Sequence, residues 1–176
     1  MPGARIPRRQ FLTAAAAASA AAAAFPAPLI AQAAGPRVVV IGGGFGGASC
    51  ARALRKADPR AAVTLVEANP TYTAMPQSSA AIAGLFELKH QQFGYGRIKD
   101  TGVTVVISAA KAVDPEKRTV RLADGASLSY DRLVLSPGID FRPGAIPGYD
   151  SKAAAIMPAA WNNGEEVALL RRQLEA

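Results

Sequence analysis

The stretch VVVIGGGFGG, residues 38–47, carries the strongest structural signal in this chain. The β-branched run from Val38 to Ile41 is typical of a strand that is buried on both faces of a parallel sheet. The six residues after it satisfy the pattern G-x-G-x-x-G, in which a glycine-rich turn joins a strand to a helix. We therefore predict a strand, a phosphate-binding turn and a helix over about residues 45–57.

The glycines of this turn have separate expected roles. Gly42 permits the tight turn, Gly44 lets the backbone approach a pyrophosphate, and Gly47 lets the helix pack close to the strand. The helix N-terminus then offers free N–H groups and the positive end of its dipole to the phosphates. A second strand is predicted over 63–66 and ends at Glu67, about twenty residues past the last glycine, where a carboxylate accepts a hydrogen bond from a ribose 2′-hydroxyl and repels a 2′-phosphate.

Further strands are predicted around this unit. Residues 68–84 predict a proline-bearing loop that leads into a short helix, because the segment is too long for a simple connection. The remaining segments are a third buried strand over 103–108, an antiparallel meander over 109–114, 118–122 and 126–130, a closing strand over 132–136, and a turn at Pro137-Gly138. The expected fold class is α/β, with a parallel sheet and an inserted antiparallel β-meander.

Composition limits the classes of partner. At 176 residues and 50% hydrophobic content, the chain is long enough for one domain with a real core. Arg5, Arg8 and Arg9 contribute to the net charge of +7 from an N-terminal leader without acids, and the remaining charge is spread along the chain. This pattern argues against nucleic-acid binding and leaves an anionic or acidic protein partner open. The sequence holds no H-E-x-x-H, C-x-x-C or clustered-carboxylate pattern, so we expect no protein-bound metal.

The leader predicts export. RIPRRQFLT, residues 5–13, is a twin-arginine pattern, and an alanine-rich run over 14–24 precedes a small-x-small site at Ala31-Gln32-Ala33. We expect residues 1–33 to be a twin-arginine signal peptide cleaved after Ala33, which leaves a periplasmic protein without a stable membrane span. A low-complexity N-terminus and a retained anchor are the alternatives. Because the twin-arginine route exports proteins already folded around their cofactors, it favours a tightly held FAD over a diffusible NAD.

The mature sequence resembles the flavoprotein subunits of flavocytochrome c sulfide dehydrogenases, which are relatives of sulfide:quinone oxidoreductases and type II NADH dehydrogenases. The wider group is indicated by the glycine turn, Glu67 and the segment YDRLVLSPG, residues 130–138. The narrower assignment depends on MPQS, residues 75–78, on IAG, residues 82–84, and on the segment IMPAAWNNGEEVALLRRQLE, residues 156–175.

The resemblance implies a Rossmann-like FAD-binding domain over 34–150 and the start of a further segment over 151–176. It implies that sulfide gives two electrons to FAD, and that a separate c-type cytochrome subunit accepts them. The loop around Met75 and Pro76 is expected against the isoalloxazine, Ala110 near the adenine, and the turn after the closing strand near the pyrophosphate. The expected cofactor-binding residues are Gly42, Gly43, Gly44, Phe45, Gly46, Gly47, Glu67, Ala68, Met75, Pro76, Ala110, Ser136, Pro137 and Gly138.

Two departures from the family limit what carries over. Members with covalently bound flavin have a cysteine where this chain has Met75, so we expect non-covalent FAD. The family's redox-active cysteines would lie beyond residue 176, so no catalytic residue is expected in this chain, which looks like a fragment of a longer flavoprotein. A sulfide:quinone or NADH:quinone oxidoreductase and a non-catalytic truncated FAD-binding fragment remain as alternatives.

Three other residues receive simpler interpretations. Cys50, the only cysteine, is expected to be a buried structural thiol rather than a nucleophile. His90, the only histidine, is expected at the surface or at a helix end. Trp161 is either a ligand-stacking residue or an aromatic anchor at a domain junction.

Overall fold

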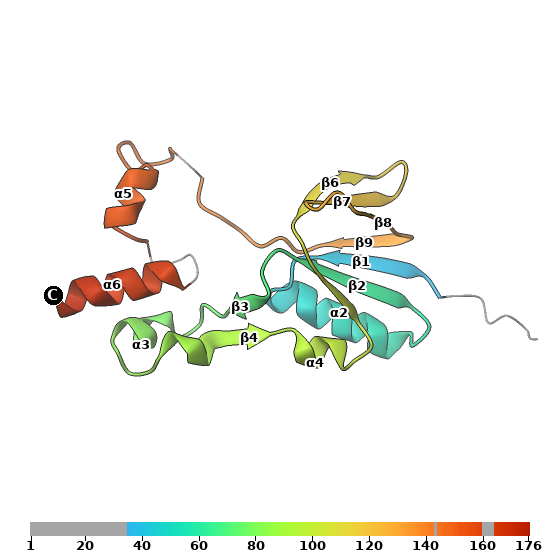
Figure 1. Ribbon diagram of the computed structural model, residues 1–176, viewed down its shortest axis with the longest axis horizontal. Helices are drawn as coiled ribbons and strands as arrows, with labels where there is room; N and C mark the ends of the chain where they lie inside the picture. Colours follow the sequence, from blue (N-terminus) through green and yellow to red (C-terminus); the bar gives the residue numbers. More distant parts are fainter. Residues whose placement is uncertain (1–34, 143, 160–163) are drawn as a thin grey trace, which may run out of the picture. The chain divides into compact units, whose positions relative to one another are not determined.

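The computed structural model describes residues 35–142, 144–159 and 164–176 (Figure 1). The expected leader and Trp161 therefore lie outside the described residues. The strands are β1 (Arg37–Ile41), β2 (Ala62–Glu67), β3 (Thr71–Thr73), β4 (Gln92–Gly94), β5 (Thr104–Ile107), β6 (Ala110–Asp114), β7 (Thr119–Leu122), β8 (Ser127–Ser129) and β9 (Arg132–Leu135). The helices are α2 (Phe45–Ala57), α3 (Ser78–Ile82), the short 3₁₀ helix η1 (Leu88–Gln91), α4 (Gly96–Lys99), α5 (Ser151–Ile156) and α6 (Glu165–Glu175).

A four-stranded parallel sheet in the order β5-β2-β1-β9 forms the centre of the fold. In register, Val39 of β1 lies opposite Thr64 of β2 and Leu133 of β9. Val38, Val39 and Val40 are all at most 5% exposed, as expected for a strand that is covered on both faces. The predicted strand, turn, helix and second strand are confirmed, with α2 over residues 45–57 as predicted.

Alternate residues of β1 enter two separate cores. Val38 and Val40 pack on the face covered by α2, whereas Val39 packs on the face covered by the meander. The α2-side core also contains Ala51, Ala61, Val63, Leu65, Tyr95 and Val103, and the meander-side core also contains Val66, Val120, Leu122 and Tyr130. In Figure 1, α2 and β6–β8 accordingly lie on opposite sides of the sheet.

The predicted meander is present as the antiparallel sheet β6-β7-β8, inserted between β5 and β9. Val120 is fully buried and Leu122 is 3% exposed, so alternate residues of β7 supply the apolar face that covers the central sheet. Backbone hydrogen bonds tie the start of the closing strand to β1, because Asp131 N–H donates to the Arg37 carbonyl oxygen at 2.8 Å. These findings confirm the predicted fold class.

Two segments differ from the prediction. Within residues 68–84, the short helix is present as α3, but β3 precedes it and pairs antiparallel with β4, so that Tyr72 lies opposite Phe93. A three-residue strand is too short for an alternating pattern, and β4 is exposed throughout, so the sequence carried no signal for this pair. Residues 136–140 form no regular turn, although Gly138 has a φ of +83°.

The C-terminal segment contains two helices. Asp150 caps α5 by accepting hydrogen bonds from the N–H groups of Lys152 and Ala153, both at 2.9 Å. α6 contacts α3, and Arg171 of α6 forms an ion pair with Glu87 at 3.8 Å. Among the residues placed by the structure, no helix is long and apolar enough to cross a membrane.

Candidate dinucleotide-binding site

The glycine turn, residues 42–47, connects the carboxyl end of β1 to α2, and its backbone leaves no room for side chains at two positions. Gly42 has a φ of +100°, and its N–H donates to the Val66 carbonyl oxygen at 2.9 Å. A Cβ on Gly42 would overlap the carbonyl oxygen of Ser136, and a Cβ on Gly47 would overlap the carbonyl oxygen of Gly42. The turn and close-packing roles expected of these two glycines therefore match the structure.

Gly44 is different, because its surroundings are open. It is the N-cap of α2, and a Cβ there would meet only the Tyr72 ring, at 3.4 Å, which is an ordinary contact. No side chain caps α2, and its first turn holds no acidic residue. A helix of 13 residues thus presents its N-terminal N–H groups and positive dipole end at an open backbone. This arrangement fits a pyrophosphate.

Glu67, at the end of β2, lies beside this turn. Its Oε2 accepts a hydrogen bond from Gly43 N–H at 2.6 Å, and its Oε1 accepts one from Asn69 N–H at 3.1 Å. The sequence predicted a ribose-binding role and did not reveal the bond to the turn. Because each carboxylate oxygen has a second lone pair, the half-buried Glu67 can also accept a ribose hydroxyl. Ala68, the next residue, is exposed.

Ser136 brings the end of β9 to the glycine turn. Its N–H donates to the Ile41 carbonyl oxygen at 2.8 Å, and its Oγ would lie 2.8 Å from a Cβ on Gly46. Pro137 and Gly138 follow it in exposed backbone. The structure therefore places the Ser136 segment beside the turn that the sequence predicted to hold the pyrophosphate.

Ala110 and the loop of Met75 and Pro76 lie on other segments. Ser108 N–H donates to the Glu67 carbonyl oxygen at 2.8 Å, which brings the chain that leads to Ala110 beside the carboxyl end of β2. Met75 is half-buried and Pro76 is exposed, in the connection between β3 and α3. A local hydrogen bond stabilises this connection, because the Ser78 hydroxyl donates to the Met75 carbonyl oxygen at 2.6 Å.

Gln91 organises this loop and was missed by the sequence analysis. Its side chain is buried, with the residue 5% exposed, and its Nε2 donates to the carbonyl oxygens of Ala74, at 3.0 Å, and Pro76, at 2.6 Å. A buried amide that bonds two carbonyls of one loop fixes the path of that loop. No pattern around Gln91 signalled this role, since its partners lie 15 and 17 residues away.

Tyr72 and Tyr95 were also missed, and both lie against the glycine turn. The Tyr95 hydroxyl donates to the Gly43 carbonyl oxygen at 3.2 Å, and Tyr95 is only 6% exposed. Burial, together with the nearby Glu67 carboxylate and Tyr72, raises the pKa of Tyr95 to about 12. Tyr72 packs edge-on against Phe45, with ring centroids 5.5 Å apart, and Phe45 itself is 60% exposed at the start of α2.

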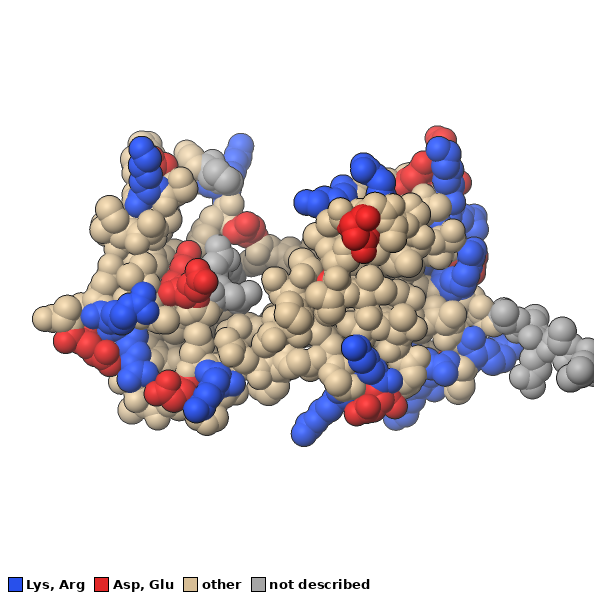
Figure 2. Space-filling model, viewed as in Figure 1, with Lys and Arg blue, Asp and Glu red and all other residues tan. Residues whose placement is uncertain are grey.

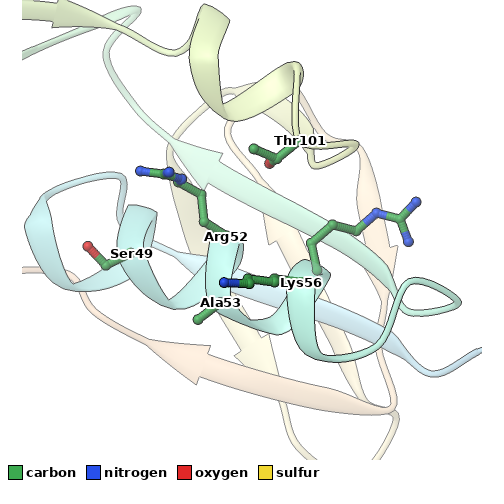
Figure 3. Close-up of a pocket in the computed structure, with 6 residues that line it drawn as sticks. Ser49, Arg52, Ala53, Lys56 and Thr101 are labelled. Atoms are coloured by element: carbon green, nitrogen blue, oxygen red, sulfur yellow. The ribbon is translucent and has the colours of Figure 1, made fainter.

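A surface hollow of about 460 Å³ lies along the outer face of α2 (Figure 3). Ser49, Arg52, Ala53, Arg55 and Lys56 line it from the helix, and Thr101 from the segment after α4. No residue of the glycine turn lines this hollow, so it is separate from the candidate site. On the face shown in Figure 2, Lys and Arg side chains are interspersed with Asp and Glu.

Cys50 and His90 lie outside the candidate site. Cys50 is a free, half-buried thiol in α2, whereas the sequence predicted a buried one; the buried residues of this helix are Gly47 and Ala51. His90 is exposed in η1, as predicted. Among residues 35–142, 144–159 and 164–176, no group of three or more His, Cys, Asp or Glu side chains is arranged to hold a metal ion.

Residues 36–168 match the family model of the pyridine nucleotide-disulphide oxidoreductases. The chain belongs to this family. The family is one of oxidoreductases, and membership implies a flavin cofactor. The open backbone at Gly44 and the uncapped N-terminus of α2 fit the pyrophosphate of that cofactor.

Several curated proteins are similar to this chain. The chain is 59% identical over 44 residues to the flavoprotein chain of the flavocytochrome c sulfide dehydrogenase of Chlorobaculum thiosulfatiphilum, which covers 25% of this chain and 92% of that sequence. It is 35% identical over 119 residues to the probable ferredoxin reductase CtmF of Castellaniella defragrans, covering 65% of this chain and 29% of the relative. It is 28% identical over 133 residues to the sulfide-quinone reductase of Aquifex aeolicus, covering 69% and 28%.

Solved structures show the same fold. The sulfide:quinone oxidoreductase of Aquifex aeolicus superposes with a TM-score of 0.66 at 23% identity, over 80% of this chain and 32% of that one. The putidaredoxin reductase of a covalent complex with putidaredoxin gives a TM-score of 0.65 at 25% identity, over 80% and 34%. The chain thus spans about a third of the length of these proteins.

Proposed function

We propose that this chain is the FAD-binding part of a flavoprotein that oxidises sulfide and passes the electrons to a c-type cytochrome subunit. The observation that carries the proposal is the 59% identity over 44 residues to a flavocytochrome c sulfide dehydrogenase flavoprotein chain. The geometry of the glycine turn supports the cofactor half of the proposal, because open backbone N–H groups and the Glu67 carboxylate lie together at one end of the sheet.

Each part of the site has a role in this proposal. The N–H groups at the start of α2 bind the FAD pyrophosphate, Glu67 accepts a hydrogen bond from the adenosine ribose, and the Met75 loop lies against the isoalloxazine. Bound FAD would supply a two-electron acceptor for the oxidation of sulfide and a one-electron donor to a haem protein.

A quinone acceptor is the second candidate. The observation in its favour is the 28% identity over 133 residues to a sulfide-quinone reductase. NADH in place of sulfide as the electron donor is a variant of this second candidate. A third candidate is a chain that binds FAD without turnover.

One anaerobic experiment separates these candidates. The flavin-bound protein is mixed with sulfide or with NADH, and the visible flavin absorbance is followed. Bleaching by sulfide and re-oxidation by ferricytochrome c support the proposal, whereas re-oxidation by a soluble quinone alone supports the second candidate. Bleaching by NADH alone moves the assignment to the NADH dehydrogenases. Bound flavin that neither donor bleaches supports the non-catalytic candidate, and a protein purified without flavin overturns the proposal.

We propose in addition that the protein reaches the periplasm, folded, through the twin-arginine route. The support is the Arg8-Arg9 pair before an alanine-rich run and a small-x-small site, and a protein acceptor would make soluble nicotinamide unnecessary there. Changing Arg8 and Arg9 together to Lys should leave precursor-sized protein in the cytoplasm. Normal export of this double variant would show that the pair is not a twin-arginine signal.

A further inference from the structure

The peptide groups on both sides of the Gly43 α-carbon are held by buried or half-buried side chains. On the N-terminal side, Gly43 N–H donates to Glu67 Oε2 at 2.6 Å. On the C-terminal side, the Gly43 carbonyl oxygen accepts the Tyr95 hydroxyl at 3.2 Å. A Cβ on Gly43 would overlap the Tyr95 ring, so the ring lies directly against the backbone at this position. Both hydrogen bonds act on the second residue of the glycine turn.

Tyr95 is itself fixed by the fold. It belongs to the α2-side core together with Val38, Val40 and Leu65 of the central strands. Its carbonyl oxygen accepts hydrogen bonds from the N–H groups of Ile98 and Lys99, both at 3.1 Å, so the backbone at Tyr95 is bound into α4. A ring anchored in the core and in a helix is a rigid support for whatever its hydroxyl contacts.

The Tyr95 hydroxyl is protonated near neutral pH and can donate to the Gly43 carbonyl oxygen. Burial and the neighbouring Glu67 and Tyr72 raise the pKa of Tyr95 to about 12, so the phenol does not ionise near neutral pH. An ionised carboxylate can only accept hydrogen bonds, and Glu67 accepts one from Gly43 N–H. The carbonyl oxygen of the same Gly43 accepts the hydrogen bond from the Tyr95 hydroxyl. The acceptor Glu67 thus binds the N–H of Gly43, and the donor Tyr95 binds its carbonyl oxygen.

The conformation of Gly43 sets the direction of the N–H groups that follow it. Gly44, the next residue, has extended backbone and is the N-cap of α2, and a Cβ there would meet only the Tyr72 ring. Those N–H groups are the ones that the proposed function assigns to the pyrophosphate. We propose that Tyr95 is a positioning residue which, together with Glu67, fixes the Gly43 backbone so that the glycine turn aims its N–H groups at a pyrophosphate. This inference rests on the proposed binding of FAD.

The test compares two probes that share adenosine and differ in the pyrophosphate, namely ADP and adenosine. The full chain and its Tyr95→Phe variant are titrated with each probe by calorimetry, and the readout is the ratio of the two dissociation constants. Tyr95→Phe keeps the packed ring and removes only the hydroxyl. We expect the preference for ADP over adenosine to fall roughly three- to tenfold, the effect of one hydrogen bond. A loss of folded protein alone lowers the apparent affinity for both probes equally and leaves the ratio unchanged.

Tyr149→Phe is the matched control. The Tyr149 hydroxyl donates to the Met157 carbonyl oxygen at 2.8 Å, so this variant also removes a tyrosine–backbone hydrogen bond, but a solvent-exposed one outside the glycine turn. Its ADP-to-adenosine ratio should equal that of the wild type. A Tyr95→Phe ratio equal to that of the wild type overturns the inference, whereas a wild-type chain that binds neither ADP nor FAD overturns the proposed function instead.

A measurement on the wild-type chain covers the case in which Tyr95→Phe does not fold. With ¹³C-labelled tyrosine, ADP should shift the NMR signal of the Tyr95 ring, because pyrophosphate binding acts on the backbone that the hydroxyl contacts. Adenosine should leave that signal in place, and the Tyr149 signal should not respond to either probe. A Tyr95 signal that adenosine and ADP shift equally contradicts a role in pyrophosphate binding.

Discussion

Gly47 packs so closely against the carbonyl oxygen of Gly42 that a Cβ atom at position 47 would overlap it. The overlap is with backbone, which cannot rotate away as a side chain can. We therefore expect Gly47→Ala to lower the free energy of unfolding by about 1–3 kcal/mol or more, the usual cost of overpacking, even though alanine favours a helix. Urea unfolding followed by circular dichroism measures this. An unchanged unfolding midpoint would show that the turn relaxes more easily than its geometry suggests.

Gly44→Ala should affect flavin binding rather than stability. A Cβ at this position meets only the Tyr72 ring, at 3.4 Å, and Gly44 has an ordinary negative φ of −70°. We expect unfolding free energy to change by at most about 1 kcal/mol, mainly because alanine is a poorer N-cap, while flavin content on purification falls sharply. The measured pair is the urea midpoint and the ratio of flavin to protein absorbance. Full flavin occupancy in Gly44→Ala would contradict the close approach of the pyrophosphate.

Asp131 makes stability depend on pH in the acid range. Its carboxylate accepts hydrogen bonds from Arg37, through the main-chain N–H at 2.8 Å and through Nε and Nη2 at 3.2 and 2.9 Å. The side-chain bonds first, and then the backbone bond, lower the pKa of Asp131 to about 2. Because the folded pKa lies below the unfolded one, the stabilisation is complete above about pH 4 to 5 and is lost as the pH falls toward 2.

The check is the difference in Tm between wild type and Asp131→Asn across this range. The difference should be constant from neutral pH down to about pH 5 and should close between about pH 4 and 2. Glu116→Gln, which removes an exposed carboxylate from the turn before β7, serves as control. A Tm difference for Asp131→Asn that persists unchanged at pH 2 would contradict the assignment to ionisation of this carboxyl.

Gln91→Leu should loosen the loop that carries Met75. The substitution removes the donor for the carbonyl oxygens of Ala74 and Pro76 and puts an apolar side chain of similar size in its place. We expect a loss of about 1–3 kcal/mol in unfolding free energy and faster amide hydrogen exchange over residues 74–78. Gln173→Leu is the matched control, because the Gln173 amide donates to the Ile156 carbonyl oxygen at an exposed site. Equal effects of the two variants would contradict a specific role for Gln91.

Met75 predicts how FAD is attached. A covalent thioether to the flavin needs a cysteine sulfur, and the only cysteine, Cys50, lies in α2, on a different element from the Met75 loop. Acid or denaturant should therefore release all flavin from the protein. Flavin fluorescence that migrates with the denatured polypeptide on a gel would refute this. In the companion variant Met75→Cys, some covalently attached flavin is expected if the loop lies against the isoalloxazine, because proximity raises the effective concentration of the thiol.

The sequence by itself determined the elements whose signals are local. The β-branched run of β1, the G-x-G-x-x-G turn, α2 and β2 follow one another within about thirty residues, and each supports the next through backbone sterics and periodicity. The positive φ of Gly42 and the close packing of Gly47 could likewise be predicted from the residue type, because a Cβ at either position would overlap backbone atoms. The meander was predictable because three short alternating segments are separated by turn residues.

Only the tertiary structure decided what surrounds the turn. Gly43 is 24 residues from Glu67 and 52 residues from Tyr95, and whether those side chains reach it depends on the path of β3, β4 and α4, which have no strong local pattern. The same holds for Gln91, whose amide meets carbonyl oxygens 15 and 17 residues away. Local propensity acts over a few neighbouring residues, whereas a hydrogen bond between distant residues exists only after the chain has packed. The sequence therefore predicted a cofactor-binding turn, and the packed fold determined which side chains contact the backbone of that turn.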